Sequence, residues 1–239
     1  MLSVVWRIKV LKDILCIASV KPLEDITVYE SALKIVSEER RRKAEKFCFA
    51  SDRRLSVGAE LLLQKAIKLA NLPEKPLRFA FGSEGKPYLL EYDEVHFNLS
   101  HAGEYVLCAL SGREVGCDLE PVRQIDLKVA LQFFTSEETA QILRQPDEEA
   151  QWNCFYRLWT LKESFLKATG KGLKLDLNSF SVTLKENDIP VVSHGLDRHF
   201  SLREYELPGY RCAVCAEGGM WKAPLICLNF DTKFHLNSI

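Results

Sequence analysis

Asp118 and Glu120 are two carboxylates at a spacing of two residues, inside an apolar run that contains Val115, Cys117 and Leu119. In a β-strand successive side chains point to opposite faces, so this spacing places both carboxylates on one face. Two like charges on a half-buried face repel each other and are costly to desolvate without a compensating cation. Mg²⁺ would compensate them, because it binds one or two carboxylates and completes its shell with water and phosphate oxygens. For this motif alone, a strand with a solvated polar face is the alternative.

A second candidate pair, Glu163 and Lys167, lies further along the chain at a spacing of four residues. Apolar side chains recur at helical spacing from Phe155 to Phe165, and Gly170 is suited to cap the C-terminus of this predicted helix. Residues four apart share one helix face, so Glu163 and Lys167 lie together. An ordinary exposed ion pair is the alternative. The bulky flanking residues instead indicate a helix buried on most sides, where a carboxylate needs a partner.

Four further predicted elements carry polar or charged side chains that are candidates for the site. A helix with a basic second half is predicted over residues 37–47, and an apolar helix capped by Asp52 is predicted to end at Asn71. Residues 82–88 form a predicted turn that contains Lys86, and residues 96–101 form a predicted strand. Alternation in that strand places His96, Asn98 and Ser100 on one face and Phe97, Leu99 and His101 on the other.

The two carboxylate motifs together resemble the paired signature of the 4'-phosphopantetheinyl transferases, specifically the long, surfactin-synthetase-activating type. The resemblance extends from about Leu15 to about Glu217, and its motifs occur in the family's order. Those motifs are Gly85-Lys86-Pro87, His-Phe-Asn-Leu-Ser-His at 96–101, Val-Gly-Cys-Asp-Leu-Glu at 115–120, Trp-Thr-Leu-Lys-Glu-Ser-Phe-Leu-Lys at 159–167, and Gly-Lys-Gly-Leu at 170–173.

The resemblance implies an α+β, pseudo-dimeric two-lobe fold in which each lobe is a helix packed on a small antiparallel sheet. We expect the N-terminal lobe at residues 1–112, with the coenzyme A nucleotide contacts, and the C-terminal lobe at 113–239, with the metal site and the catalytic helix. The chain has 239 residues, which suits one large domain or two similar lobes. No internal sequence repeat is evident, so the lobe symmetry is expected from the resemblance alone.

The activity that the resemblance implies is transfer of 4'-phosphopantetheine from coenzyme A to a serine of an apo acyl or peptidyl carrier protein, with release of adenosine 3',5'-bisphosphate. Asp118, Glu120 and Glu163 are then the expected ligands of Mg²⁺, with Mn²⁺ as an alternative ion. Glu163, or a water bound to the metal, is the expected base for the serine proton. Lys167 is expected to stabilise the charge that develops on the bridging oxygen or to protonate the leaving group.

The resemblance also implies contacts to coenzyme A. Arg40 and Lys43 match basic positions at the nucleotide end, although a solvated helix face is the alternative for such a charge run. Ser56 matches a hydroxyl position near the ribose phosphate. Lys86 and His101 match phosphate contacts, with Ser100 as an added hydroxyl donor; an exposed turn lysine and a buried core histidine are their alternatives.

Composition restricts the class of protein. The chain is 47% hydrophobic and 27% charged, as in soluble globular proteins, and its formal net charge of -1 argues against general nucleic-acid binding.

The eight cysteines are scattered in apolar segments, Cys212 and Cys215 included, and we expect reduced thiols in a cytoplasmic enzyme. Charged residues interrupt residues 1–12, so we expect no targeting segment and no membrane contact, and we expect these residues to be additional to the family pattern. The family resemblance implies a monomer.

Two other classes of protein stay open. One is a non-catalytic homologue that only binds carrier proteins; the presence of Asp118, Glu120, Glu163 and Lys167 argues against it. The other is a different Mg²⁺-dependent phosphoryl-transfer enzyme such as a nuclease, which the near-neutral charge disfavours.

Overall fold

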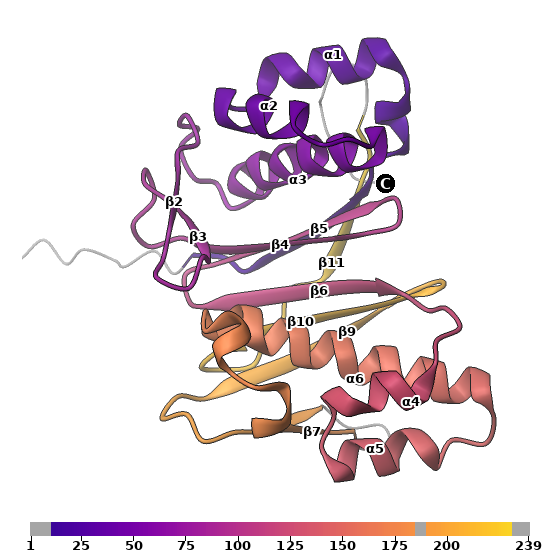
Figure 1. Cartoon of the computed structure of the whole chain (residues 1–239). Helices are drawn as coiled ribbons and strands as arrows, with labels where there is room; N and C mark the ends of the chain where they lie inside the picture. Colours follow the sequence, from indigo (N-terminus) through magenta and orange to yellow (C-terminus); the bar gives the residue numbers. More distant parts are fainter. Residues whose placement is uncertain (1–10, 185–189, 231–239) are drawn as a thin grey trace, which may run out of the picture.

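The chain folds into two lobes, and in each lobe a long helix packs on a β-sheet (Figure 1). The computed structural model describes residues 11–184 and 190–230, so the prediction for the first ten residues lies outside them. The two long helices lie on the outside and the two sheets face each other, which gives layers in the order helix, sheet, sheet, helix. This architecture confirms the predicted α+β, two-lobe fold.

The first lobe has a four-stranded sheet in the order β11-β1-β5-β4. Strand β1 (Ile14–Ser19) and strand β4 (His96–Ala102) both pair antiparallel with β5 (Tyr105–Ser111). Strand β11 (Leu225–Leu228) pairs parallel with β1, so the sheet is not purely antiparallel. One strand of the first lobe therefore comes from the second half of the chain. The proposed division between residues 112 and 113 stays a prediction.

Helix α3 (Ala50–Leu69) packs on the outer face of this sheet, and α1 (Ile26–Ile35) and α2 (Glu38–Glu45) pack on α3. Ser37 caps α2 by accepting a hydrogen bond from the backbone N–H of Arg40, as its sequence position predicts. The predicted cap at Asp52 is wrong, because α3 begins at Ala50 after Phe49 and has no side-chain cap. Asp52 instead lies in the first turn, where a negative charge favours the helix dipole.

The second lobe has an antiparallel sheet in the order β6-β10-β9, with helix α6 on its outer face. Gly170 ends α6 in the left-handed region, with φ of 67°, which confirms the predicted cap. The bounds are β6 (Val115–Pro121), β9 (Phe200–Leu207), β10 (Tyr210–Glu217), α4 (Leu127–Ala130), α5 (Ser136–Leu143) and α6 (Glu148–Thr169). Two small hairpins complete the fold, β2 (Phe79–Phe81) with β3 (Pro87–Leu89) and β7 (Ser181–Thr183) with β8 (Val191–Ser193).

A core between the two sheets joins the lobes. Leu15, Leu107 and Ala109 from the first sheet pack with Cys117 and Leu119 from the second. These strands are therefore buried on both faces, which explains their long apolar runs. The core fixes β6 against β1 and β5 and so fixes the carboxylate strand relative to the first lobe.

The cysteines behave as the sequence predicts. All eight are free thiols, and six of them are buried. Cys212 packs in the core between the sheets, whereas Cys215 packs against α6, so the two lie on opposite faces of β10 and do not form a pair. In the described part of the chain, no helix combines the length and the apolar character that a membrane span requires.

Candidate active site

Strand β6 and helix α6 approach each other closely at Gly116. A Cβ atom at this position would clash with the backbone of Ser164, Lys167 and Ala168 on α6, so only glycine allows the approach. Asp118 lies two residues further along β6 on the same face. The sequence motif thus combines the carboxylates with the small residue that lets the helix reach them.

Gly116→Ala is expected to lower the free energy of unfolding by about 1–3 kcal/mol and to lower activity, because the added methyl group pushes α6 away from β6. Urea denaturation measures the first effect. Gly195→Ala is the matched control, since a Cβ there meets nothing within 4 Å and its φ is not in the left-handed region. A Gly116→Ala protein as stable as this control would contradict the close approach.

Asp118 is the most buried of the predicted metal ligands, with 3% of its surface exposed. Its Oδ1 atom accepts hydrogen bonds from Lys167 Nζ at 2.6 Å and from Ser100 Oγ at 3.0 Å. Its Oδ2 atom is buried and has no hydrogen-bond partner. A buried carboxylate oxygen without a partner is costly, and a cation would satisfy it. This oxygen, in a set of carboxylate donors, fits a hard divalent ion such as Mg²⁺.

The three predicted ligands affect one another electrostatically. Burial raises the pKa of Glu163, and the charge of Asp118 raises it further against the opposing charge of Lys167. Burial also raises the pKa of Glu120, with added contributions from Asp118 and Glu163. In residues 11–184 and 190–230, no group of three or more His, Cys, Asp or Glu side chains is arranged to hold a metal ion. The three carboxylates are therefore close enough to interact but do not form a preassembled metal site.

Lys167 contacts both the carboxylate of Asp118 on β6 and the hydroxyl of Ser100 on β4. Burial by itself would lower its pKa, but the charge and hydrogen bond of Asp118 outweigh this effect and raise the pKa. The ammonium group also lies 3.4 Å from Ser100 Oγ, across the boundary between the lobes. Lys167 is therefore protonated at neutral pH and positioned beside the buried carboxylate.

Strand β4 connects the carboxylates to a cavity in the first lobe. On one face Ser100 bonds to Asp118, and Asn98 Oδ1 accepts a hydrogen bond of 2.9 Å from the backbone N–H of Cys117. On the other face Phe97, Leu99 and His101 line the cavity. This division between the faces is the alternation that the sequence predicts.

The cavity has a volume of about 290 Å³ and lies between α2, α3, β2 and β4. Four of the residues predicted to contact coenzyme A line it, namely Arg40, Lys43, Ser56 and His101. Its walls combine these polar groups with the rings of Phe47, Phe79, Phe81 and Phe97. Partial desolvation, and then the charge of Lys167, lower the pKa of His101, so its ring is neutral at neutral pH.

Lys86, which the sequence predicts as a phosphate contact, is not among the residues that line this cavity. Lys86 Nζ donates hydrogen bonds to Glu114 Oε2 at 2.6 Å and to the carbonyl oxygens of Val115 and Ala168. Burial raises the pKa of Glu114, but the bonds from His96 and Lys86 outweigh this and lower it to about 2. Lys86 thus ties the start of β6 to the end of α6, beside a second cavity of about 490 Å³.

Sequence reasoning missed several residues of the site. Asn98 holds the backbone next to Asp118, and the rings of Phe79 and Phe81 line the first-lobe cavity. Glu60 bonds to Arg40 from α3. The spacing of Glu60, four residues after Ser56, was a usable signal because it places both on one helix face.

Comparison with known proteins gives a consistent result over most of the chain. The sequence model of the 4'-phosphopantetheinyl transferase superfamily matches residues 114–215, and that of the 4'-phosphopantetheinyl transferase N-terminal region matches residues 22–113. The chain is 36% identical over 191 residues to 4'-phosphopantetheinyl transferase Sfp of Bacillus subtilis. The matched region covers 78% of this chain and 84% of that protein. It is 34% identical over 183 residues to 4'-phosphopantetheinyl transferase gsp of Aneurinibacillus migulanus, with 76% of each chain covered.

Among solved structures, a holo-(acyl-carrier-protein) synthase from Bacillus anthracis in complex with CoA (3',5'-ADP) aligns with 44% of this chain and 96% of its own. The TM-score is 0.39 and the sequence identity is 16%.

Proposed function

Because the chain belongs to the 4'-phosphopantetheinyl transferase superfamily, we propose that it transfers 4'-phosphopantetheine from coenzyme A to a serine of an apo carrier protein and releases adenosine 3',5'-bisphosphate. The observation that carries this proposal is that the two faces of β4 contribute to two different sites. One face of the strand lines a basic and aromatic cavity suited to a nucleotide, and the other bonds to the buried carboxylate Asp118. A single strand thus joins a binding site to a reaction site.

The nucleotide end of coenzyme A would occupy the cavity. Arg40 and Lys43 supply positive charge for phosphate groups, and Ser56 and the neutral ring of His101 supply hydrogen-bond donors. The aromatic walls provide apolar surface for the base. Binding there would bring the pyrophosphate toward Lys167, which lies near both His101 and Asp118.

In the reaction, the serine oxygen forms a bond to the phosphorus next to pantetheine, and the bond from that phosphorus to the bridging oxygen breaks. Glu163 would accept the serine proton as the general base. Lys167 would stabilise the negative charge on the leaving oxygen. Positioning and charge neutralisation supply most of the catalysis in such transfers.

Asp118, Glu120 and Glu163 would hold Mg²⁺, or Mn²⁺ in its place, and the bound ion would neutralise pyrophosphate charge as a Lewis acid. The unpartnered Oδ2 of Asp118 supports this assignment. Until the ion binds, Lys167 compensates the same carboxylate from its other oxygen.

Incubation of an apo acyl or peptidyl carrier protein with this protein, coenzyme A and Mg²⁺ is expected to increase the carrier's mass by one phosphopantetheine group. Intact-mass spectrometry measures the increase. A chelator and the Asp118→Asn variant are both expected to abolish it, because each removes the divalent cation from the site. No increase with carriers of several types would contradict the proposed function. A full increase in the chelator would contradict the metal requirement alone.

A further inference from the structure

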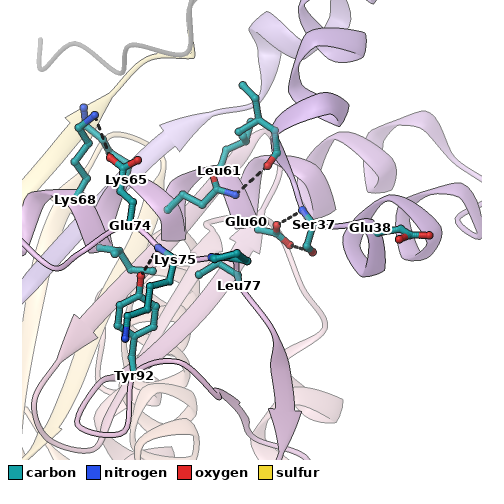
Figure 2. A pocket seen from close by; sticks show the side chains of 14 residues that line it. Ser37, Glu38, Glu60, Leu61, Lys65, Lys68, Glu74, Lys75, Leu77 and Tyr92 are labelled. Carbon is teal, nitrogen blue, oxygen red and sulfur yellow. Dashed lines mark hydrogen bonds and ion pairs between the residues drawn. The ribbon is translucent and has the colours of Figure 1, made fainter.

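Glu60 is a fully buried carboxylate in the middle of α3, with none of its surface exposed. Oε1 accepts a hydrogen bond of 2.5 Å from the backbone N–H of Ser37, and Oε2 accepts one of 2.9 Å from Ser37 Oγ. Figure 2 shows Glu60 reaching from α3 to Ser37 at the wall of a cavity of about 620 Å³. Burying a charge is costly unless it is paired, so this carboxylate requires a cation.

That cation is Arg40. The Nε atom of Arg40 donates to Glu60 Oε2 at 3.1 Å, and its Nη1 atom lies 3.4 Å from Ser56 Oγ. The guanidinium carbon lies 5.5 Å from the centre of the Phe79 ring. The guanidinium group is therefore held from three sides, and the bond to Glu60 is the charged one. Because Glu60 uses only the Nε donor and Ser56 accepts one N–H of Nη1, the other terminal N–H groups can reach the cavity that Arg40 and Ser56 line.

Capping of α2 alone does not require this arrangement. Ser37 already caps the helix through its hydroxyl oxygen, which accepts from the backbone N–H of Arg40 at 3.2 Å. Glu60 accepts further bonds from the backbone N–H and the hydroxyl of Ser37 and from the Arg40 side chain. It thereby fixes both the start of α2 and the guanidinium group of Arg40 to α3.

We propose that Glu60 is a positioning residue for coenzyme A binding: it aims the Arg40 guanidinium at an anionic group of the nucleotide. This inference rests on the proposed function. Glu60 itself lies behind Arg40, since it lines the cavity on the far side and not the nucleotide cavity. Its effect on the ligand therefore passes through Arg40.

Glu60→Gln is expected to raise the Kd and the KM for coenzyme A about tenfold, the effect of losing one charge-assisted hydrogen bond. The amide cannot accept from Arg40 Nε with the same strength, so the guanidinium group loses its fixed direction. At saturating coenzyme A, kcat is expected to change less than about twofold, because Glu60 touches none of the reacting groups. Calorimetric titration with coenzyme A and steady-state kinetics separate these quantities.

Glu138→Gln is the matched control, because Glu138 is equally buried and pairs with a lysine in the other lobe. It is expected to lower the Tm without changing the Kd for coenzyme A. Glu60→Asp is a second variant that keeps the charge and withdraws it by one methylene, with the same expected direction. If either Glu60 variant loses stability while binding coenzyme A as the wild type does, the proposal is overturned.

A double-mutant cycle with Arg40→Met tests the route of the effect. If Glu60 acts through Arg40, then Glu60→Gln weakens binding by less than about twofold in the Arg40→Met background. If Glu60→Gln instead weakens binding as much in the Arg40→Met background as in the wild type, the two residues act independently and the proposal is overturned. The proposed coenzyme A site would not be affected by that result. If the wild type itself does not bind coenzyme A, the proposed nucleotide site is wrong and the role of Glu60 with it. If the wild type binds coenzyme A and the Glu60 variants bind it equally well, only the role of Glu60 is wrong.

Discussion

Replacing Glu163 with Gln is expected to lower kcat by about 10²–10⁴-fold, the usual contribution of a general base, while the fold stays intact. Gln has nearly the same shape as Glu but cannot accept the serine proton, and it is a weaker ligand for a divalent ion. The carrier-modification assay under single-turnover conditions measures this loss. A kcat within about threefold of the wild type would contradict the assigned role.

The same substitution is expected to leave the Tm unchanged or to raise it at neutral pH without divalent ions. The pKa of Glu163 is raised in the folded protein, so the ionised side chain is less stable there than in the unfolded chain. This destabilisation is absent below the ordinary pKa of the carboxyl and complete above the raised pKa. The advantage of Glu163→Gln should therefore disappear as the pH falls through that interval.

Thermal unfolding with and without Mg²⁺ provides the control. Mg²⁺ is expected to raise the Tm of the wild type, because an ion that binds only the folded state stabilises it. It should raise the Tm of Glu163→Gln less. A fall in Tm of several degrees on substitution would instead identify Glu163 as a structural residue.

Much of the site follows from local patterns in the sequence. Alternation along residues 96–101 assigned Ser100 and His101 to opposite faces of a strand, and the contacts of β4 agree. The spacing of Asp118 and Glu120 placed them on one face of β6, opposite the core between the sheets. Such patterns are reliable because strand periodicity is fixed by backbone geometry.

Contacts between distant segments could not be predicted in this way. Strand β11 pairs with β1 across almost the whole chain, and nothing in the residues of either strand specifies that partner. Spacing put Glu163 and Lys167 on one helix face, but the ion pair recorded for Lys167 is with Asp118 on another element. The motif of Lys86 likewise did not indicate its partners, since its three acceptors come from β6, α6 and the residue before β6; its phosphate contact stays a prediction.

Lys162 is the second residue for which we expect a large effect, although it lies next to Glu163 in the same motif. Lys162 is fully buried and donates hydrogen bonds to both carboxylate oxygens of Glu138, at 2.7 and 2.8 Å, and to the carbonyl oxygen of Phe180. Its ammonium also lies 4.2 Å from the centre of the Phe180 ring. Lys162 therefore joins α6 to α5 and to the residue before β7.

Lys162→Met is expected to lower the free energy of unfolding by about 3–5 kcal/mol, because it leaves the Glu138 carboxylate buried without its cation. Urea denaturation measures this loss. Lys174→Met is the matched control, since Lys174 forms an ion pair of similar length with Glu84 but is largely exposed. It should cost less than about 1 kcal/mol.

The double variant Lys162→Met with Glu138→Gln separates loss of the pair from loss of packing. It is expected to recover part of the stability, because the buried charge is gone and the amide oxygen can still accept from the Val182 N–H. A double variant less stable than Lys162→Met would contradict this account. At a temperature where Lys162→Met stays folded, its kcat should approach that of the wild type, whereas Glu163→Gln stays folded and has the lowered kcat. Of two adjacent residues of one motif, one would then act on stability and the other on catalysis, because consecutive positions on α6 face different neighbours.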